Sequence, residues 1–301
     1  MPRRGNYLLS AFAACLGLAL AMGTGPLAAG TRPSLVTQDA PRLKGGTLGP
    51  NDCITCHEDA VTSFSHSAHA SANVSCEACH SGGKAHIDSG GEKSKITTPK
   101  SLPPAEASAL CMTCHNDRGR SHWAGSTHDS RKVSCITCHT THPKGTPVKG
   151  MLRAPQLDLC TTCHLQQKAK LMRSGHMPFR EGKVQCTSCH NPHGTANDKN
   201  LLQASVNEMC YTCHAEKRGP FLWEHPPVRE NCLNCHDPHG TIQDNLLRVK
   251  EPMLCQQCHV GTRHPSQTHV ASERFSFNKS CLNCHSQIHG SNHPSGARFM
   301  R

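Results

Sequence analysis

Ten copies of the pentapeptide Cys-x-x-Cys-His run through this chain of 301 residues, and they use twenty of its 21 cysteines. In this motif the two thiols add to the vinyl groups of a porphyrin, and the histidine that follows binds the iron. The motif is therefore the attachment site of a c-type haem. A chain that carries so many covalent cofactors has to fold around them, and this restricts its architecture more than any other feature.

The motifs give the predicted attachment residues of ten c-type haems, which we number 1 to 10 in chain order. The cysteines predicted to form thioether bonds are Cys53, Cys56, Cys76, Cys79, Cys111, Cys114, Cys135, Cys138, Cys160, Cys163, Cys186, Cys189, Cys210, Cys213, Cys232, Cys235, Cys255, Cys258, Cys281 and Cys284. The histidines predicted to bind iron from the motif side, called motif histidines below, are His57, His80, His115, His139, His164, His190, His214, His236, His259 and His285.

Zinc sites and disulfide frameworks are the alternative uses of so many cysteines. Neither has a need for a histidine directly after the second cysteine of each motif, and here that histidine is present every time. The remaining cysteine, Cys15, has no histidine beside it. A lipid anchor at Cys15 is disfavoured because residues 16–22 stay apolar, as in the middle of a signal sequence.

Residues 1–29 have the pattern of a secretory signal peptide. Arg3 and Arg4 form a basic start, residues 7–22 an apolar run, and small residues around Ala28 and Ala29 a cleavage point. The run is too short and too interrupted by Gly and Pro for a secure membrane span. We therefore expect export to the periplasm, where c-type haem is attached, and a mature chain of residues 30–301.

The net charge of the chain is +11, of which Arg3 and Arg4 contribute two, so the mature chain carries +9. A basic balance often indicates nucleic acid or an anionic membrane as partner. Here the propionates of ten haems would offset most of the charge, and there is no basic run interleaved with aromatic residues. We therefore expect no nucleic-acid binding.

The composition predicts that the haems themselves form the core. Aromatic residues make up only 4% of the chain. Leu, Ile, Val and Phe fall below the roughly 20% under which composition indicates disorder. Without cofactors such a polypeptide could not offset its conformational entropy. We expect a mostly irregular multihaem cytochrome c fold: short α-helices that carry the motifs, little or no β-sheet, and one elongated haem array over residues 30–301.

An internal repeat divides the array into five units of two motifs. Residues 186–195 match residues 232–241, and the Asn-Leu-Leu at 200–202 matches that at 245–247. The motifs start 22 to 26 residues apart, except for a 35-residue interval after Cys76. The extra length, Ser81 to Pro104, has the composition of an exposed loop.

Each unit offers two further histidines, one after each of its motifs, and we predict these as the distal iron ligands. They are His69, His86, His128, His142, His176, His193, His225, His239, His269 and His289. The choice stays open between neighbours in four places: His66 or His69, His122 or His128, His264 or His269, and His289 or His293. The sequence does not show which distal histidine serves which iron.

Two imidazoles leave a low-spin iron with no open coordination position, which favours electron transfer over catalysis. We therefore expect an electron carrier and no enzyme. A catalytic haem would need an altered motif or a missing distal ligand, and all ten motifs end in histidine.

Longer segments carry a resemblance to a known family. Residues 123–128, 217–228 and 281–294, together with the ten motifs, resemble the periplasmic decahaem cytochromes of the MtrA/DmsE type. The resemblance covers nearly all of the mature chain. It implies a wire of bis-histidine haems inside an outer-membrane β-barrel porin. Such a wire exchanges electrons with a periplasmic or inner-membrane cytochrome on one side and an extracellular multihaem cytochrome or terminal reductase on the other.

The expected function is thus conduction across the outer membrane for extracellular metal reduction or iron oxidation. A chain in which 18% of the residues are charged cannot face lipid, so such a conduit needs a barrel around it. A freely soluble periplasmic shuttle to a terminal reductase is the alternative, and an oxyanion reductase with one five-coordinate haem is a third.

Overall fold

The computed structural model describes residues 48–300 apart from 177–178, 180 and 261–278. By its contacts the chain divides into two units, Met1–Arg42 and Leu43–Arg301, and every described residue belongs to the second. The predicted signal peptide, residues 1–29, lies outside the described residues. That signal and the single domain of five two-haem units therefore stay predictions.

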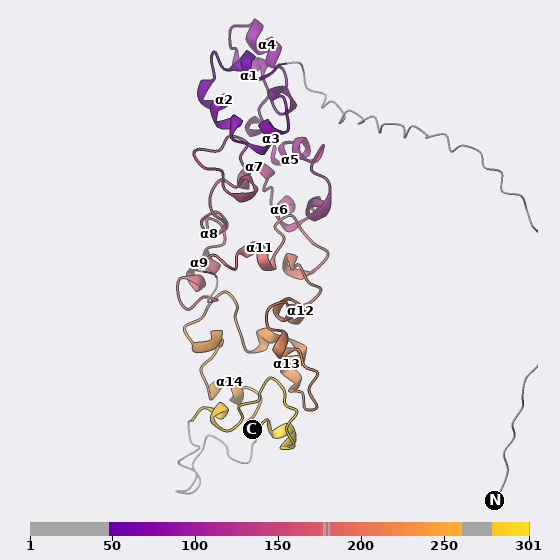
Figure 1. The fold of residues 1–301 in the computed structure, drawn as a ribbon, viewed down its shortest axis with the longest axis vertical. Helices are drawn as coiled ribbons and strands as arrows, with labels where there is room; N and C mark the ends of the chain where they lie inside the picture. The colour runs from indigo at the N-terminus through magenta and orange to yellow at the C-terminus, as the bar shows by residue number, and fades with distance from the viewer. Residues whose placement is uncertain (1–47, 177–178, 180, 261–278, 301) are drawn as a thin grey trace, which may run out of the picture. The chain divides into compact units, whose positions relative to one another are not determined.

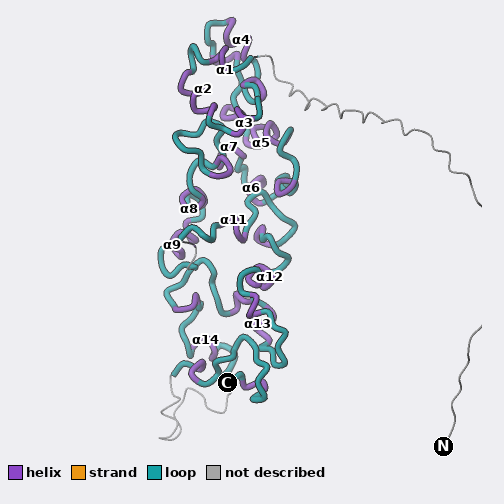
Figure 2. Tube along the Cα trace, viewed as in Figure 1, coloured by secondary structure: helices purple, strands orange, loops and turns teal. Residues whose placement is uncertain are grey.

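The described residues form thirteen short α-helices joined by turns and loops (Figures 1 and 2). The α-helices are α1 (Pro50–Cys53), α2 (Glu58–Ser65), α3 (Ala68–Ser71), α4 (Gly83–Asp88), α5 (Pro104–Met112), α6 (Thr127–Ser130), α7 (Cys135–Cys138), α8 (Gln156–Cys160), α9 (Leu165–Leu171), α11 (Cys186–Cys189), α12 (Val206–Tyr211), α13 (Pro226–Glu230) and α14 (Met253–Gln256). Isolated bridges are the only β pairing among the described residues. The predicted fold class, short helices with little or no sheet, is confirmed.

Single 3₁₀ turns complete the regular structure. They are η1 (Cys76–Ala78), η2 (Lys93–Lys95), η3 (Pro99–Ser101), η4 (Arg118–Arg120), η5 (Lys149–Met151), η6 (Asp198–Asn200), η7 (Ala215–Lys217), η8 (Cys232–Asn234), η9 (Asp244–Leu246), η11 (Cys281–Asn283) and η12 (Gly296–Arg298). The segment predicted as a plain exposed loop, Ser81 to Pro104, contains α4, η2 and η3. The loop prediction was incomplete, because the segment contains these helical turns. One of them, α4, carries the predicted ligand His86.

Each haem motif is one helical turn. In all ten, the histidine N–H donates to the carbonyl of the first cysteine at 2.9–3.0 Å. The first motif of a unit continues or ends a helix, as Cys160 ends α8. The second motif starts a turn of its own after an extended residue, as Cys135 does after Ser134. The motif therefore builds its own local helix and needs no long flanking helix.

Serine caps place two of the distal histidines. The side chain of Ser67 accepts the N–H of Ala70 at 3.2 Å and starts α3, which carries His69. The side chain of Ser126 accepts the N–H of Asp129 at 3.2 Å and starts α6, which carries His128. A capping serine satisfies an N–H that such a short helix otherwise leaves unpaired.

Glycines after two distal histidines allow adjacent units to approach closely. A Cβ on Gly194 would lie 2.4 Å from the carbonyl oxygen of His122, and one on Gly240 would lie 2.4 Å from that of Lys170. Next to Gly240, Ser174 and Thr241 form an antiparallel bridge. Both glycines have positive φ, +99° and +128°, which a side chain would also oppose.

Aliphatic packing contributes little to this unit. Among the described residues the only buried hydrophobic ones are Ala107 and Trp123. No described helix has the length and apolar character needed to cross a membrane. Within the unit, α1 and α4 lie at one end and α13 and α14 towards the other (Figure 1). The polypeptide alone therefore has almost no hydrophobic core.

Candidate haem centres

Nine motif histidines each lie beside one of the predicted distal histidines. The centres of the two rings are 5.9–6.3 Å apart in every pair. The pairs are His57 with His86, His80 with His142, His115 with His69, His139 with His193, His164 with His128, His190 with His239, His214 with His176, His236 with His289, and His259 with His225.

This spacing fits one iron between the two rings. A metal–imidazole nitrogen bond is about 2 Å long. Two such bonds on opposite sides of one iron, together with the distance from each nitrogen to the centre of its ring, separate the ring centres by about 6 Å. The residues present thus suit a haem iron that has a histidine on each face.

Backbone carbonyls orient many of these rings. A carbonyl oxygen can only accept, so an Nδ1 that contacts one carries the proton, and the Nε2 lone pair is left for a metal. The motif histidines held in this way are His139 by Gly150, His190 by Lys199, His236 by Asn245 and His285 by Arg298. The distal ones are His86 by Glu92, His128 by Pro192 and His142 by Ala60.

Burial keeps the ligand rings in the neutral form that binds metal. It lowers the pKa of several of them below the ordinary value, and the ring of the paired histidine acts in the same direction. This holds for His69, His80, His176, His193, His225 and His289. At neutral pH these rings therefore keep a lone pair available for iron.

The pairs follow one rule along the chain. A first-motif histidine pairs with a histidine of the preceding unit, as His164 does with His128. A second-motif histidine pairs with a histidine of the following unit, as His139 does with His193. His57 has no preceding unit, and it pairs with His86 of its own unit. The sequence left these partners open, and in eight of the nine pairs the partner lies in a neighbouring unit.

In three of the four places where the sequence left two histidines open, only one of the two lies beside a motif histidine. His69, His128 and His289 each lie beside a motif histidine, whereas His66, His122 and His293 form no ring pair with any motif histidine of the described residues. His264 and His269 lie outside the described residues, and so does any test of the tenth pair. Assignment of all twenty iron ligands stays a prediction.

The cysteines of the two motifs in one unit lie close together. The first cysteine of each first motif contacts the first cysteine of the second motif, in the pairs Cys53–Cys76, Cys111–Cys135, Cys160–Cys186, Cys210–Cys232 and Cys255–Cys281. Contact with Cys111 lowers the pKa of the Cys135 thiol to about 6. All twenty motif cysteines are free thiols without disulfide partners. Haems attached to the two motifs of a unit would therefore have neighbouring thioether edges.

A zinc site is the alternative metal arrangement to compare with this geometry. No three His, Cys, Asp or Glu side chains of the described residues converge as in a zinc site. The carbonyls that orient the motif histidines belong to residues of 3₁₀ turns, Gly150 in η5, Lys199 in η6 and Asn245 in η9. Each ring pair thus lies next to the two thiols of one motif, an arrangement that could hold one c-type haem.

Comparison with known proteins gives a consistent result. A family model described as "Doubled CXXCH motif" matches residues 176–219 and 225–264, and one described as "Cytochrome c-type protein NrfB-like" matches residues 76–163. The chain is 42% identical over 274 residues to the multiheme cytochrome MtrA of Shewanella baltica, which covers 84% of this chain and 81% of that protein.

Two cytochrome c-type proteins NrfB share shorter stretches. The one from Haemophilus influenzae is 36% identical over 67 residues, which is 22% of this chain and 29% of that protein. The one from Escherichia coli is 25% identical over 125 residues, which is 38% of this chain and 65% of that protein.

Proposed function

The chain belongs to the family of the multihaem c-type cytochrome MtrA and transfers electrons, and we propose that it is a ten-haem conductor that crosses the outer membrane inside a β-barrel partner. The observation that carries this proposal is the set of nine histidine pairs, each spaced for one iron. Eight of the nine join residues of two adjacent units. A cofactor held at each of them would form an uninterrupted series along the chain.

The twenty motif cysteines hold the haems, and the paired histidines are their axial ligands. The nine pairs do not include the motif histidine His285 or the predicted distal histidine His269. By symmetry with His57 and His86 at the first unit, we propose that His269 and His285 bind haem 10. His269 lies outside the described residues.

Ligation by two histidines makes conduction the function of every haem. When bound, each haem supplies a one-electron Fe(III)/Fe(II) couple. Two imidazoles occupy both axial positions of the iron, so no substrate can coordinate. The protein keeps those imidazoles in place through the carbonyls that bind their Nδ1 atoms, which limits movement of the ligands when the charge of the iron changes.

The ligation is tested by electron paramagnetic resonance of the oxidised holoprotein together with its mass. We expect ten covalently bound haems and low-spin ferric signals only. A high-spin ferric signal that accounts for one haem would contradict full bis-histidine ligation and favour an enzyme.

The barrel partner is proposed from the family and from polarity. Charged residues make up 18% of the chain, and irregular backbone such as these loops cannot be exposed to lipid. The secretory signal at residues 1–29 and a periplasmic location at the outer membrane belong to the same proposal. So do a periplasmic or inner-membrane cytochrome as one redox partner and an extracellular cytochrome or terminal reductase as the other.

Co-purification and vesicle assays test the conduit. The holoprotein should elute with a porin, and a dye trapped inside sealed vesicles should be reduced from outside only when both proteins are present. A holoprotein that always elutes alone and leaves the dye oxidised would support the soluble shuttle instead.

A further inference from the structure

Haems 4 and 6 form a matched pair within the array. On the motif side, His139 donates from Nδ1 to the carbonyl of Gly150 at 2.8 Å, and His190 donates to that of Lys199 at 2.9 Å. The distal histidine is His193 at haem 4 and His239 at haem 6, and each comes from the unit that follows its motif histidine. Because the motif sides match, we compare the charges near the two distal histidines.

The two distal sides differ in charge. Arg120 acts electrostatically on His193, whereas Asp237 and Lys170 act on His239. The residue two places before each distal histidine accepts its backbone N–H through a side-chain oxygen. Asn191 does so for His193 at 3.0 Å, and Asp237 does so for His239 at 3.1 Å. At haem 2 the same contact is made by Thr140 to His142 at 3.1 Å. Asp237 is the charged member of this set.

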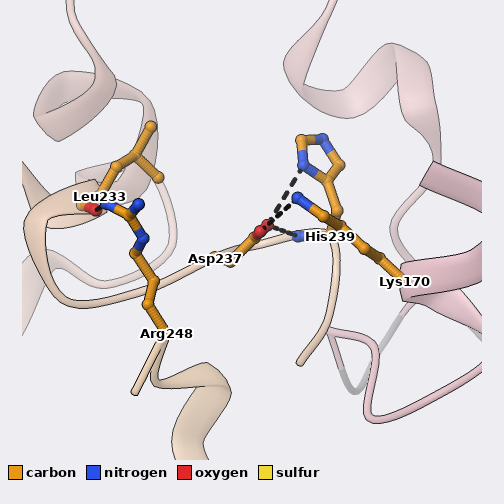
Figure 3. Close-up of polar contacts among 5 residues, drawn as sticks. All are labelled: Lys170, Leu233, Asp237, His239 and Arg248. Carbon is orange, nitrogen blue, oxygen red and sulfur yellow. Dashed lines mark hydrogen bonds and ion pairs between the residues drawn. The ribbon is translucent and has the colours of Figure 1, made fainter. Parts of the chain in front are cut away.

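The carboxylate of Asp237 contacts both the distal ring and a lysine of another unit (Figure 3). Its Oδ1 is 3.5 Å from Nδ1 of His239, and its Oδ2 is 2.6 Å from Nζ of Lys170. The side chains of Asp237 and Lys170 are only 20% and 32% exposed. Arg248, drawn in the same view, donates instead to the carbonyl of Leu233 at 3.1 Å. Lys170 is therefore the cation that partners Asp237.

Backbone contacts hold this arrangement. Lys170 lies on α9, 67 residues before Asp237. The backbone of Gly240 packs against the carbonyl of Lys170, and the Ser174–Thr241 bridge joins the same two segments. In the preceding unit, Asn191 instead donates from Nδ2 to the carbonyl of Gly119 at 2.7 Å. A neutral contact between units is thus replaced by an ion pair at haem 6.

A charge near an axial ligand changes the energy of the two iron states differently. Ferric haem carries one positive charge more than ferrous haem, so a nearby carboxylate stabilises the ferric state and a nearby ammonium opposes it. Partial burial strengthens both effects, because less water screens them. A carboxylate beside the Nδ1–H of a ligating histidine also makes that ligand more basic. Hydrogen bonds and burial around the cofactor are among the factors that set its potential.

We propose that Asp237 and Lys170 act on haem 6 as a pair of positioning residues with opposite effects on its reduction potential. Asp237 lowers the potential and Lys170 limits that decrease, so haem 6 has a lower potential than haem 4. Reduction adds one electron to the iron from a neighbouring haem, and the charges of Asp237 and Lys170 do not change. The inference rests on the proposed ligation of haem 6 by His190 and His239.

Two single variants of the full holoprotein test the proposal. After ten haems are verified by mass, Asp237→Asn should raise the potential of one haem, and Lys170→Gln should lower the potential of the same haem. The measurement is a potentiometric titration followed by electron paramagnetic resonance and by difference absorption against the parent. The double variant should fall between the two single variants. Asp244→Asn, the same change at an exposed position of the same unit, is the control and should leave all ten potentials in place.

A purely structural role predicts a different result. If the ion pair only joins the two units, both variants lose stability, and their potentials stay unchanged or move in the same direction; either result overturns the proposal. If Asp237→Asn does not fold, Lys170→Gln alone still tests the proposal. Only the proposed electrostatic role predicts that Lys170→Gln lowers the potential of haem 6.

His239→Met separates this inference from the ligation on which it rests. A raised potential of one haem in His239→Met, with no shift in Asp237→Asn and Lys170→Gln, overturns the role of the pair and leaves the ligation intact. Unchanged potentials in His239→Met overturn both the ligation of haem 6 and the inference built on it.

Discussion

The two motifs of a unit present their histidines in different ways. A second motif follows an extended residue, and in four of the five its histidine donates from Nδ1 to the carbonyl of a residue in a 3₁₀ turn, as His190 does to Lys199 at 2.9 Å. A first motif continues or ends a helix, as in α8, and its histidine makes no such contact to a carbonyl of the described residues. The partner histidine comes from the following unit in the first case and from the preceding unit in the second.

This difference makes the proposed ligand pairs cross every boundary between units twice, in opposite directions. Between the second and third units, for example, His139 of the second unit pairs with His193 of the third, and His164 of the third unit pairs with His128 of the second. The pair His57–His86 is different, because both residues belong to the first unit. An interior haem would therefore join two units, whereas haem 1 would close only its own.

The largest effect is expected from removal of an interior ligand. His193→Ala takes away a proposed link between two units, and loss of a metal ligand in a chain with so little apolar core should cost more than about 4 kcal/mol in free energy of unfolding. His86→Ala, which removes the equivalent ligand within the first unit, should cost less. Denaturant unfolding of both holoproteins measures this. Equal losses for the two variants would contradict the distinction between interior and terminal haems.

A milder change at the same interior position separates redox effects from stability. His193→Met replaces imidazole with thioether, which should raise the potential of one haem and leave the chain folded. His122→Met is the matched control, because His122 forms no ring pair with a motif histidine of the described residues. Redox titration of both variants is the measurement. A shift in His122→Met, or none in His193→Met, would argue against the assignment of these two histidines.

The haem attachment of a second motif can be tested without a change in its histidine. Cys235→Ala removes one thioether of haem 8, and the remaining thiol, Cys232, still allows attachment through a single bond. Haem should then be lost more readily during denaturing electrophoresis, and the fold should weaken locally. Haem-stained gels and the intact mass measure this. A variant that retains haem as firmly as the parent protein during denaturing electrophoresis would speak against attachment at this motif.

The close contact between Gly194, which follows the distal histidine His193, and the carbonyl of His122 provides a stability test. Ala in place of Gly194 would bring Cβ within 2.4 Å of the His122 carbonyl at a φ of +99°, and we expect a loss of about 2–4 kcal/mol. Gly182 also has a positive φ, +70°, but nothing lies near its Cβ position, so Gly182→Ala should lose only about 1 kcal/mol. Thermal unfolding compares the two. Equal losses would mean that backbone strain, and not the close approach of units, sets the cost at Gly194.

The sequence predicted what is local in this molecule. The motif specifies its own helical turn, and the position of a histidine within the repeat selected His69, His128 and His289 over their neighbours, which the ring pairs agree with. It could not predict which distal histidine pairs with which motif histidine. The motifs share one sequence pattern, yet the partner comes from the preceding unit for a first motif and from the following unit for a second motif. The sequence match of the two Asn-Leu-Leu segments is one residue out of register. In the structure Leu201 bridges to His190 and Leu247 bridges to His236, so Leu201 corresponds to Leu247 and not to Leu246.

The true register is defined by backbone conformation. Lys199 and Asn245 both have left-handed backbone, with φ of 53° and 54°, and their carbonyls accept from His190 and His236. In the second unit Gly150 provides the same conformation at φ 74° and binds His139. Glycine and asparagine tolerate this region well, whereas lysine is strained there. A repeat defined by letters alone does not show that these three residues have one function.

The smallest effect is expected from an exchange of residues at this position. Lys199→Asn should stabilise the holoprotein by less than about 1 kcal/mol, because Asn is favoured in left-handed backbone, and the exposed contact of Lys199 with Asp198 at 3.7 Å contributes little. Asn245→Lys should destabilise it by a similar amount. Both carbonyls stay in place, so the haem potentials should not change. Denaturant unfolding and redox titration check the two halves of this expectation. Changes of the same sign in both variants would show that the left-handed carbonyl does not play the same part in the two units, and a shifted potential would show that the carbonyl contact depends on the side chain beside it.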